Sequence, residues 1–275
     1  MEPILKAIVL GIIQGFTEFL PISSTAHLRI IPSFFGWEDI GSGYTAVIQI
    51  GTMAAIIIYF RGDIAFMTKS MSHSVIKRDF NSYGARLFIM ISVGTIPIII
   101  FGYTFQNLID NEFRSLYVMA YSLIIFSLIM AFAEHKSKKN VKIENVKLTD
   151  AVVVGFFQAL ALIPGTSRSG STITGAFLRN MDRESAARFS FLLSIPAILI
   201  SGLYKLYSDR EELFSTSESL GSIIVATIVS GITGYIAIWF LLFYMRTHSL
   251  NLFVIYRIIL GILVLVLLNF NIITN

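Results

Sequence analysis

Gln14–His27, with the sequence QGFTEFLPISSTAH, interrupts an otherwise apolar N-terminal region. Residues 4–20 are mostly apolar, and Pro21 opens a serine and threonine cluster that leads into a second apolar run ending at residue 35. Each run is shorter than the roughly 20 residues that a helix needs to cross a bilayer. A polar break is tolerated at membrane depth only where protein or a wet cavity surrounds it. Residues 3–36 therefore favour a re-entrant helical hairpin over an ordinary kinked helix.

The overall composition places this hairpin in a membrane protein. The chain has 275 residues, of which 55% are hydrophobic and only 14% are charged, and its mean hydropathy is +0.75. A soluble domain usually carries about 25% charged residues. The absence of cysteine excludes disulfides, thiol nucleophiles and thiolate metal sites. The net charge of +4 is small, so we expect the bilayer, and no nucleic acid, as a partner.

Six further stretches are long and apolar enough to span a membrane: 44–60, 86–105, 116–133, 186–204, 221–245 and 251–270. A second interrupted region covers residues 149–180, where a short apolar lead reaches Pro164 and a polar tip. We predict an all-α integral membrane protein with a single domain over residues 1–275. It has six full transmembrane helices and two re-entrant helix hairpins. We expect no cleavable signal peptide, because residues 4–20 lack a small-residue cleavage site.

Lysine and arginine residues indicate the orientation, because cytoplasmic loops carry an excess of both. The connections 61–86 and 134–149 carry five each, and further arginines follow residue 178. One topology places fourteen of the 21 basic residues in the cytoplasm: Arg61, Lys69, Lys77, Arg78, Arg86, Lys136, Lys138, Lys139, Lys142, Lys147, Arg179, Arg183, Arg188 and Arg246. In that topology both termini lie outside, the first hairpin enters from outside, and the second enters from inside.

The two hairpins resemble each other. Gly11–Gln14 and Gly155–Gln158 lie 144 residues apart, and each leads to a proline that opens a Ser/Thr-rich tip. Three spans follow each hairpin, and since three is odd, the second half must be inverted relative to the first. We therefore predict an inverted-topology repeat with halves at about 1–134 and 149–275. Such repeats place the functional site near the bilayer midplane, where the broken helices meet.

The first tip carries side chains suited to catalysis: Gln14, Glu18, Ser23, Ser24, Thr25 and His27. Gln14 and Glu18 are four residues apart and share one helix face. An ionisable group inside a membrane is costly and indicates function. A carboxylate, hydroxyls and an imidazole are the parts of a nucleophile, an acid or base, and a metal site.

The second tip carries side chains suited to binding an anion: Ser167, Arg168, Ser169 and Thr172. They lie on a glycine-flanked loop before a helix, whose N-terminus presents N–H groups and a positive dipole end. The planar guanidinium of Arg168 matches phosphate oxygens. Arg257 is also at membrane depth, where it bridges helices or reaches an interface, and we assign it no catalytic role. Together the tips suit attack on a phosphorus atom within the membrane.

Residues 14–27 resemble the first signature of the bacterial undecaprenyl-diphosphatase family of the bacitracin-resistance type, and residues 164–170, PGTSRSG, resemble its second. Segments 47–51 and 189–193, the length and the charge topology also match, so the resemblance covers essentially the whole chain. Two positions depart from the family pattern: Gln14 stands where other members have Glu, and Ala26 replaces a Gly. The first departure leaves a single carboxylate for a metal site.

The resemblance implies a phosphatase of the bacterial cytoplasmic membrane that converts undecaprenyl diphosphate into the monophosphate carrier of cell-wall polymers. It implies a divalent cation, Mg²⁺ or Ca²⁺, near Gln14 and Glu18. It makes Ser24 the nucleophile with His27 as its partner, or His27 the nucleophile itself, and the sequence leaves this choice open. Arg168 binds phosphate, and we expect five further side chains to help bind the substrate: Ser167, Ser169, Thr25, Ser23 and Thr172.

Two other classes of protein compete with a phosphatase. Inverted repeats and broken helices are also typical of transporters, and an anion clamp would suit a flippase for a lipid phosphate or a carrier for a small anion. The nucleophile and carboxylate of the first tip favour the enzyme, because transport alone does not need them. A non-catalytic lipid-binding scaffold is disfavoured by Glu18 together with His27. The sequence leaves a homodimer open.

Overall fold

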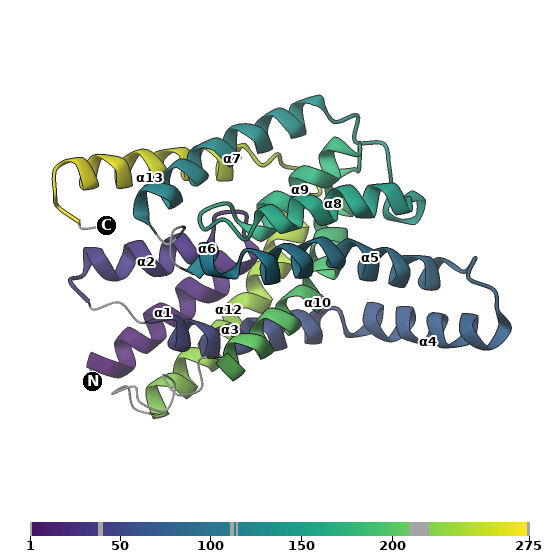
Figure 1. Cartoon of the computed structure of the whole chain (residues 1–275), viewed down its shortest axis with the longest axis horizontal. Coiled ribbons are helices and arrows are strands. Elements are labelled where there is room, and N and C mark those ends of the chain that lie inside the picture. The colour runs from purple at the N-terminus through teal and green to yellow at the C-terminus, as the bar shows by residue number, and fades with distance from the viewer. Residues whose placement is uncertain (1, 38–40, 111–112, 114, 209–219, 274–275) are drawn as a thin grey trace.

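A computed structural model describes residues 2–37, 41–110, 113, 115–208 and 220–273, and within these ranges the chain is helical without β-strands (Figure 1). The first half contains α1 Glu2–Phe19, α2 Ser24–Phe34, α3 Gly41–Tyr59, α4 Arg61–Lys77, α5 Tyr83–Thr104, α6 Gln106–Asp110 and α7 Leu116–Lys136. The second half contains η2 Ile143–Asn145, α8 Leu148–Leu160, α9 Arg168–Leu178, α10 Arg183–Ser208, α12 Leu220–Tyr244 and α13 Asn251–Asn269.

Five helices are long and apolar enough to cross a membrane, namely α5, α7, α10, α12 and α13, and α3 with α4 forms a sixth, bent candidate. They coincide with the six predicted stretches, which confirms a multi-pass helical membrane protein. One difference concerns residues 61–77, which were predicted as part of a basic connection and form α4, bent by 66° from α3. Residues 63–77 contain neither glycine nor proline, so nothing in the sequence stops the helix after the bend.

The two interrupted regions each form a pair of helices joined by a turn. In Figure 1 the α1–α2 and α8–α9 turns meet near the middle of the molecule, approached from opposite directions. The second helices, α2 and α9, each have 11 residues and begin 144 residues apart, which is the predicted offset. Their serine caps, Ser23 and Ser167, have positive φ values of 74° and 69°. In each cap the hydroxyl accepts the backbone N–H three residues on, so the same local device starts both helices.

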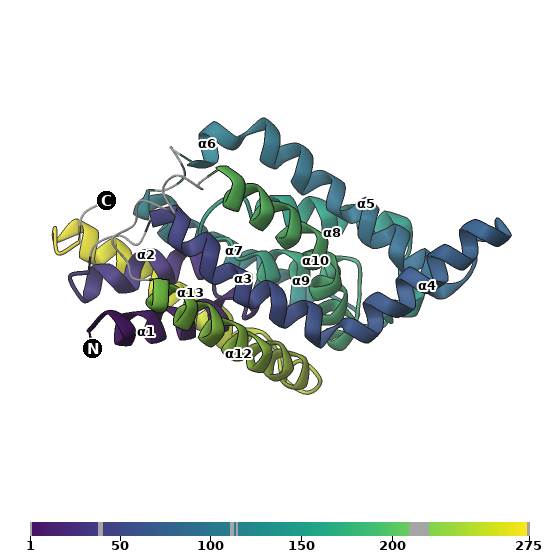
Figure 2. The same ribbon diagram turned by 90° about the horizontal axis from the view of Figure 1, so that it is seen from below.

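Helix pairing is matched between the two halves. The first hairpin helix of each half packs on a long helix of the other half, α1 on α12 and α8 on α5, while α3 pairs with α10 and α7 with α13. The glycines of the repeated motif allow this close approach: a Cβ on Gly11 would lie 2.6 Å from the carbonyl oxygen of Ala226, and one on Gly155 2.4 Å from that of Gly94. Figure 2 shows α5 and α12 on opposite flanks, with α3 and α10 between them.

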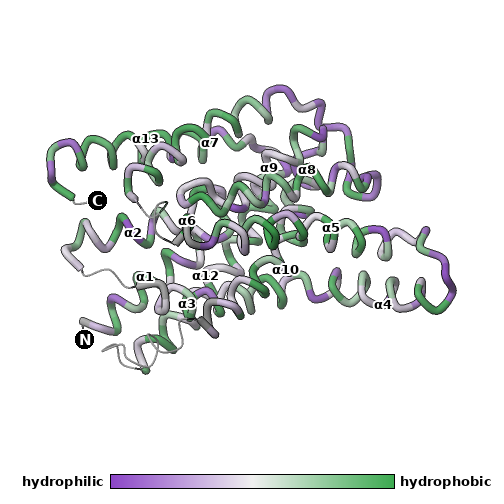
Figure 3. The backbone as a smooth tube through the Cα atoms, viewed as in Figure 1, coloured by the Kyte–Doolittle hydropathy of each residue, from purple (hydrophilic) through white to green (hydrophobic). Residues whose placement is uncertain are grey.

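The basic connections gather at one end of the molecule and both termini at the other (Figures 1 and 3). Three arginines that were expected only to set the topology also form ion pairs there: Arg179 with Asp150, Arg183 with Glu134, and Arg188 with Asp63. The main apolar core includes Phe177, Phe189 and Phe191, all nearly inaccessible, and it reaches the first hairpin turn at Phe19 and Ile22. The hairpin turns lie between the ion-paired basic end and the end that carries the termini (Figure 1).

Candidate active site

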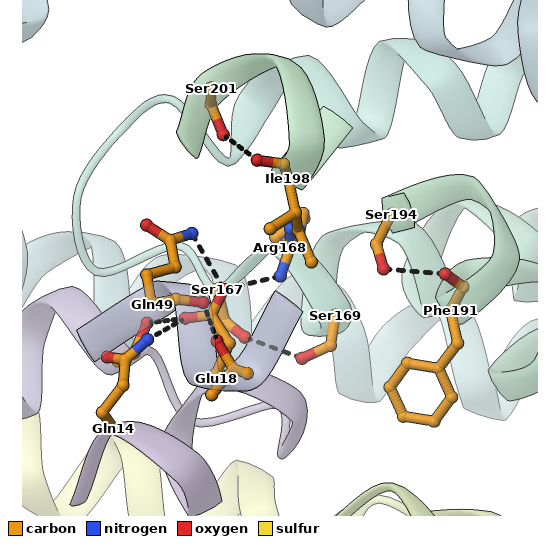
Figure 4. A network of polar contacts seen from close by, with 12 residues as sticks. Gln14, Glu18, Gln49, Ser167, Arg168, Ser169, Phe191, Ser194, Ile198 and Ser201 are labelled. Atoms are coloured by element: carbon orange, nitrogen blue, oxygen red, sulfur yellow. Dashed lines mark hydrogen bonds and ion pairs between the residues drawn. The ribbon is translucent and has the colours of Figure 1, made fainter. Parts of the chain in front are cut away.

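Glu18, in the last turn of α1, is the centre of a polar cluster between the two hairpin turns (Figure 4). Its side chain is 8% exposed. One carboxylate oxygen accepts from the guanidinium of Arg168 at 2.7 Å and from the amide of Gln49 at 3.4 Å. The other accepts from the hydroxyl of Ser24 at 2.7 Å and from the amide of Gln14 at 3.2 Å. Four donors from four helices therefore converge on one carboxylate, as a charge buried in a membrane requires.

Ser24 is paired with Glu18, and not with His27, the partner that the family resemblance implied. Ser24 is the first residue of α2, and the turn at residues 20–23 returns its hydroxyl to the last turn of α1. His27 lies one turn further along α2 and is buried. The serine that was predicted as a nucleophile is therefore hydrogen-bonded to a carboxylate, an arrangement that can take up its proton.

His27 is held on both sides of its ring. Nδ1 lies 2.7 Å from the carbonyl oxygen of Ser23, which can only accept, so Nδ1 carries the proton. Nε2 lies 2.5 Å from the hydroxyl of Tyr256 in α13, so in the neutral ring it accepts that hydroxyl's proton. The two rings are also stacked, with centroids 5.6 Å apart. With both nitrogens engaged, His27 supports the turn and borders the site.

Arg168 and the helix N-termini make the cluster suitable for an anion. Arg168 begins α9, and its side chain is 15% exposed. Among the described residues its Nε has no hydrogen-bond partner, so the guanidinium keeps donor capacity beyond Glu18. The α2 and α9 helices both begin at the meeting turns, and the first N–H groups of a helix lack partners within that helix. Ser24 begins α2, and Arg168, which begins α9, binds the same carboxylate as Ser24, so an arginine and two positive helix ends are brought together at Glu18.

Arg257, for which the sequence suggested only a bridging role, joins the two turns. It is 1% exposed and donates to the carbonyl oxygens of Pro21, Gly165 and Thr166 at 3.2, 3.1 and 2.9 Å. Carbonyl groups in a turn have no helical partner, and at membrane depth each one left unpaired is costly. A single guanidinium therefore provides hydrogen-bond donors for carbonyl groups of both hairpin turns and fixes one turn relative to the other.

The remaining predicted residues hold the turns together. Thr25 accepts the N–H of Gly165 across the junction at 3.4 Å, and Ser169 donates to the carbonyl oxygen of Leu20 at 3.1 Å. Ser23 and Ser167 are the helix caps. Thr172 is fully buried, bonds to the carbonyl oxygen of Arg168 and pairs with Ser190 of α10. These side chains surround the site, and their contact with substrate stays a prediction.

Sequence reasoning overlooked two members of the cluster. Gln49 was noted only as part of a matching segment, although a lone amide among apolar residues 44–60 was a usable signal. Tyr256 gave no signal, because tyrosine is common at membrane interfaces. Its role depends on the contact between α13 and the first hairpin. His27 and Tyr256 are 229 positions apart along the chain, so they meet only in the folded molecule.

The side-chain oxygens of Glu18 and Gln14 are ligands of the kind that a hard divalent cation binds. No group of three or more Asp, Glu, His or Cys side chains is arranged to hold a metal ion within the described ranges. The cluster supplies one carboxylate, and the buried amide oxygen of Gln14 has no partner among the described residues. Mg²⁺ typically takes one or two carboxylates and completes its shell with water and substrate phosphates. The predicted pair Gln14 and Glu18 is compatible with such a site.

Fold and site together define a multi-pass helical membrane protein with a charged centre suited to a phosphorylated ligand. A family model described as "Bacitracin resistance protein BacA" matches residues 7–263. Proteins named "Undecaprenyl-diphosphatase" from Chloroherpeton thalassium and Chlorobium limicola are 49% and 48% identical over 274 and 271 residues, covering 97% and 96% of both chains. One from Chlorobaculum tepidum is 47% identical over 96% of each chain. The chain belongs to the bacitracin resistance protein BacA family, which confirms the resemblance of its two signature stretches.

Proposed function

We propose that this protein is an undecaprenyl-diphosphatase, which hydrolyses undecaprenyl diphosphate to undecaprenyl phosphate and inorganic phosphate. Membership of the family and the names of its relatives support this activity. The observation that carries the chemistry is the Ser24 hydroxyl, 2.7 Å from the Glu18 carboxylate and beside Arg168. The product would serve as the lipid carrier for cell-wall polymers, and the activity fits a role in bacitracin resistance.

The reaction begins with Ser24. Its oxygen attacks the terminal phosphorus, a bond from Oγ to phosphorus forms, and the bond to the bridging oxygen breaks. The Ser24 proton passes to Glu18, and undecaprenyl phosphate leaves as an anion that needs no proton. Water then displaces the phosphoryl group from Ser24 as inorganic phosphate, and Glu18 returns the proton to Oγ. Such transfers depend chiefly on positioning and on neutralising charge.

Arg168 and the helix N-termini supply that neutralisation. In the structure Arg168 is paired with Glu18, which keeps the guanidinium charged and in place without a ligand. A bound diphosphate would compete with Glu18 for this fork of donors. That exchange would release the carboxylate oxygens for the proton of Ser24, so binding of substrate and activation of the nucleophile are linked.

A divalent cation, Mg²⁺ or Ca²⁺, would be held by Glu18 and Gln14. Once bound, it would lower the negative charge on the phosphoryl oxygens. The orphaned oxygen of Gln14 supports this assignment. Removing the cation with a chelator is expected to abolish phosphate release, and adding back Mg²⁺ or Ca²⁺ to restore it.

We place the protein in the bacterial cytoplasmic membrane with both termini and the opening of the site on the outer side. The basic end, α4 and the α7–α8 connection included, would face the cytoplasm. The two hairpins would be re-entrant within a single inverted-repeat domain, which the matched helix pairs and the shared serine caps support. A homodimer is compatible with this arrangement.

Rapid quench with undecaprenyl diphosphate and purified protein in detergent tests the proposal. Wild-type protein with Mg²⁺ is expected to release phosphate and to carry a transient phosphoserine at Ser24. Ser24→Ala is expected to lose both. A phosphohistidine at His27, with no phosphoserine at Ser24, would identify His27 as the nucleophile in place of Ser24. No phosphate release, with lipid movement across vesicles, would reject the enzyme in favour of the transporter.

A further inference from the structure

An apolar cavity lies beside the second hairpin turn. Its volume is about 360 Å³, within the order of size of small-ligand pockets. Every residue that lines it is Phe, Leu, Ile or Ala. Its walls include Phe101 of α5, Phe105 directly after α5, Leu108 of α6, and Phe156 and Leu160 of α8, and Ile163 of the second hairpin turn also lines it. Among the described residues that line it, none has a polar side chain for a headgroup, so this lining suits a hydrocarbon.

The cavity and the candidate active site share one short segment. Ile163 lines the cavity, and Arg168, five residues later, binds Glu18. Five residues span at most about 18 Å even when fully extended. The intervening Gly165 is held by Thr25 on one side and by Arg257 on the other, so the segment does not move independently of the site. A ligand with its phosphate at Arg168 and a chain longer than about 18 Å is therefore long enough to reach the cavity.

Several side chains in the walls of the cavity are exposed on the surface of the molecule. Phe156 is 52% exposed, Phe105 44%, Leu108 39% and Leu160 37%. In the proposed membrane orientation these side chains would face hydrocarbon, so a lipid tail could enter sideways without crossing water. Aromatic walls also offer large, rigid contact area to a branched apolar chain.

We infer that this cavity binds the first isoprene units of the substrate tail, next to the diphosphate. The inference rests on the proposed function, which supplies an amphiphile with a diphosphate head. The rest of the long tail stays in the bilayer. The cavity then selects for a prenyl chain attached to the diphosphate, a task that Arg168 and the helix N-termini cannot perform, because they contact only the head.

Filling the cavity tests this inference. Leu160→Trp places a larger ring in the cavity from α8, and Leu108→Trp does so from α6. Ile100→Trp is the matched control, because Ile100 is 55% exposed on α5 but does not line the cavity. Each variant is assayed on undecaprenyl diphosphate and on methyl diphosphate, which carries the same head without an isoprene unit.

Both cavity variants are expected to lower kcat/KM for undecaprenyl diphosphate by about tenfold, the order that a poorly fitting apolar pocket costs. Activity on methyl diphosphate, and both activities of Ile100→Trp, should stay unchanged. Equal losses on both substrates, or no loss relative to Ile100→Trp, would overturn the inference. Wild-type protein that hydrolyses neither substrate would instead reject the proposed function.

Cross-linking of wild-type protein gives a second measurement that does not depend on the folding of a variant. The probe is a prenyl diphosphate with a photoreactive group on its first isoprene unit. Labelled peptides from residues 101–109 or 156–163 are expected. Labelling confined to other helices would contradict the inference.

Discussion

Replacing Glu18 by glutamine changes the candidate site with almost no change in side-chain shape. The carboxylate accepts two short hydrogen bonds, both 2.7 Å long, from Ser24 and Arg168. Glutamine keeps one acceptor oxygen and turns the other into a donor that faces a hydroxyl or a guanidinium. It is also far too weak a base to take the serine proton. Both the pairing of Arg168 and the activation of Ser24 are lost together.

The expected loss in kcat follows from the role of the carboxylate. Losing a general base typically costs about 10²- to 10⁴-fold, or about 2.7–5.4 kcal/mol of transition-state stabilisation. The same substitution also breaks an ion pair whose side chains are 15% and 8% exposed. Removing one partner of a buried pair costs stability on the order of 3–5 kcal/mol. A thermal shift is therefore expected beside the kinetic loss and has to be separated from it.

Glu134→Gln provides that separation. Glu134 is also buried, accepts from Arg183 at 2.7 Å and from the backbone N–H of Leu250 at 2.8 Å, and lies at the basic end. The assay is phosphate release from undecaprenyl diphosphate in detergent, with thermal unfolding of the same samples. Glu134→Gln should lower the melting temperature while kcat stays within about threefold of wild type. Glu18→Gln with wild-type kcat, or both variants equally inactive, would refute the assigned role of Glu18.

Three further perturbations test the surroundings of the site. Tyr256→Phe removes the hydroxyl that donates to Nε2 of His27 and is expected to lower kcat by less than about tenfold, the value of one neutral hydrogen bond. A larger loss of kcat in steady-state turnover would indicate that the Tyr256 hydroxyl takes part in the reaction. In Arg257→Lys the single ammonium group cannot donate to the carbonyl oxygens of Pro21, Gly165 and Thr166 at once. Each carbonyl left unpaired costs about 1–3 kcal/mol, so the variant should unfold at a clearly lower temperature than the wild type. Gly155→Val places a Cβ 2.4 Å from the carbonyl oxygen of Gly94 and should destabilise the protein by about 1–3 kcal/mol. Unfolding at the wild-type temperature would contradict the close approach of α8 and α5 at these two glycines.

Much of the fold could be predicted because hydropathy acts locally. The six spans and the two interrupted regions follow from runs of apolar residues and from Pro21 and Pro164, and the structure has helices at each. The repeat was visible in Gly11 and Gly155, whose lack of a side chain is required where helices cross. The α4 helix was missed, because a basic sequence predicts the side of the membrane and says little about whether the backbone is helical.

The candidate site was only partly predictable. Glu18 and Arg168 stood out because a charge is costly in an apolar sequence, and the structure joins them at 2.7 Å. Their direct pairing was not foreseen, since the arginine was expected to bind only the ligand. Ser24 was expected beside His27, but the turn at residues 20–23 points its hydroxyl to Glu18.

The amino-acid sequence by itself determined where the apolar helices lie, where the two interrupted regions break and that Glu18 and Arg168 are buried, because these depend on neighbours along the chain. The tertiary structure decided which of those groups touch. Glu18 meets Arg168 across 150 positions, and His27 meets Tyr256 across 229. Such contacts depend on how each helix is rotated and which helix it packs against. A hydrogen bond needs its donor and acceptor within about 3 Å, and only the packed arrangement of the helices sets such a distance.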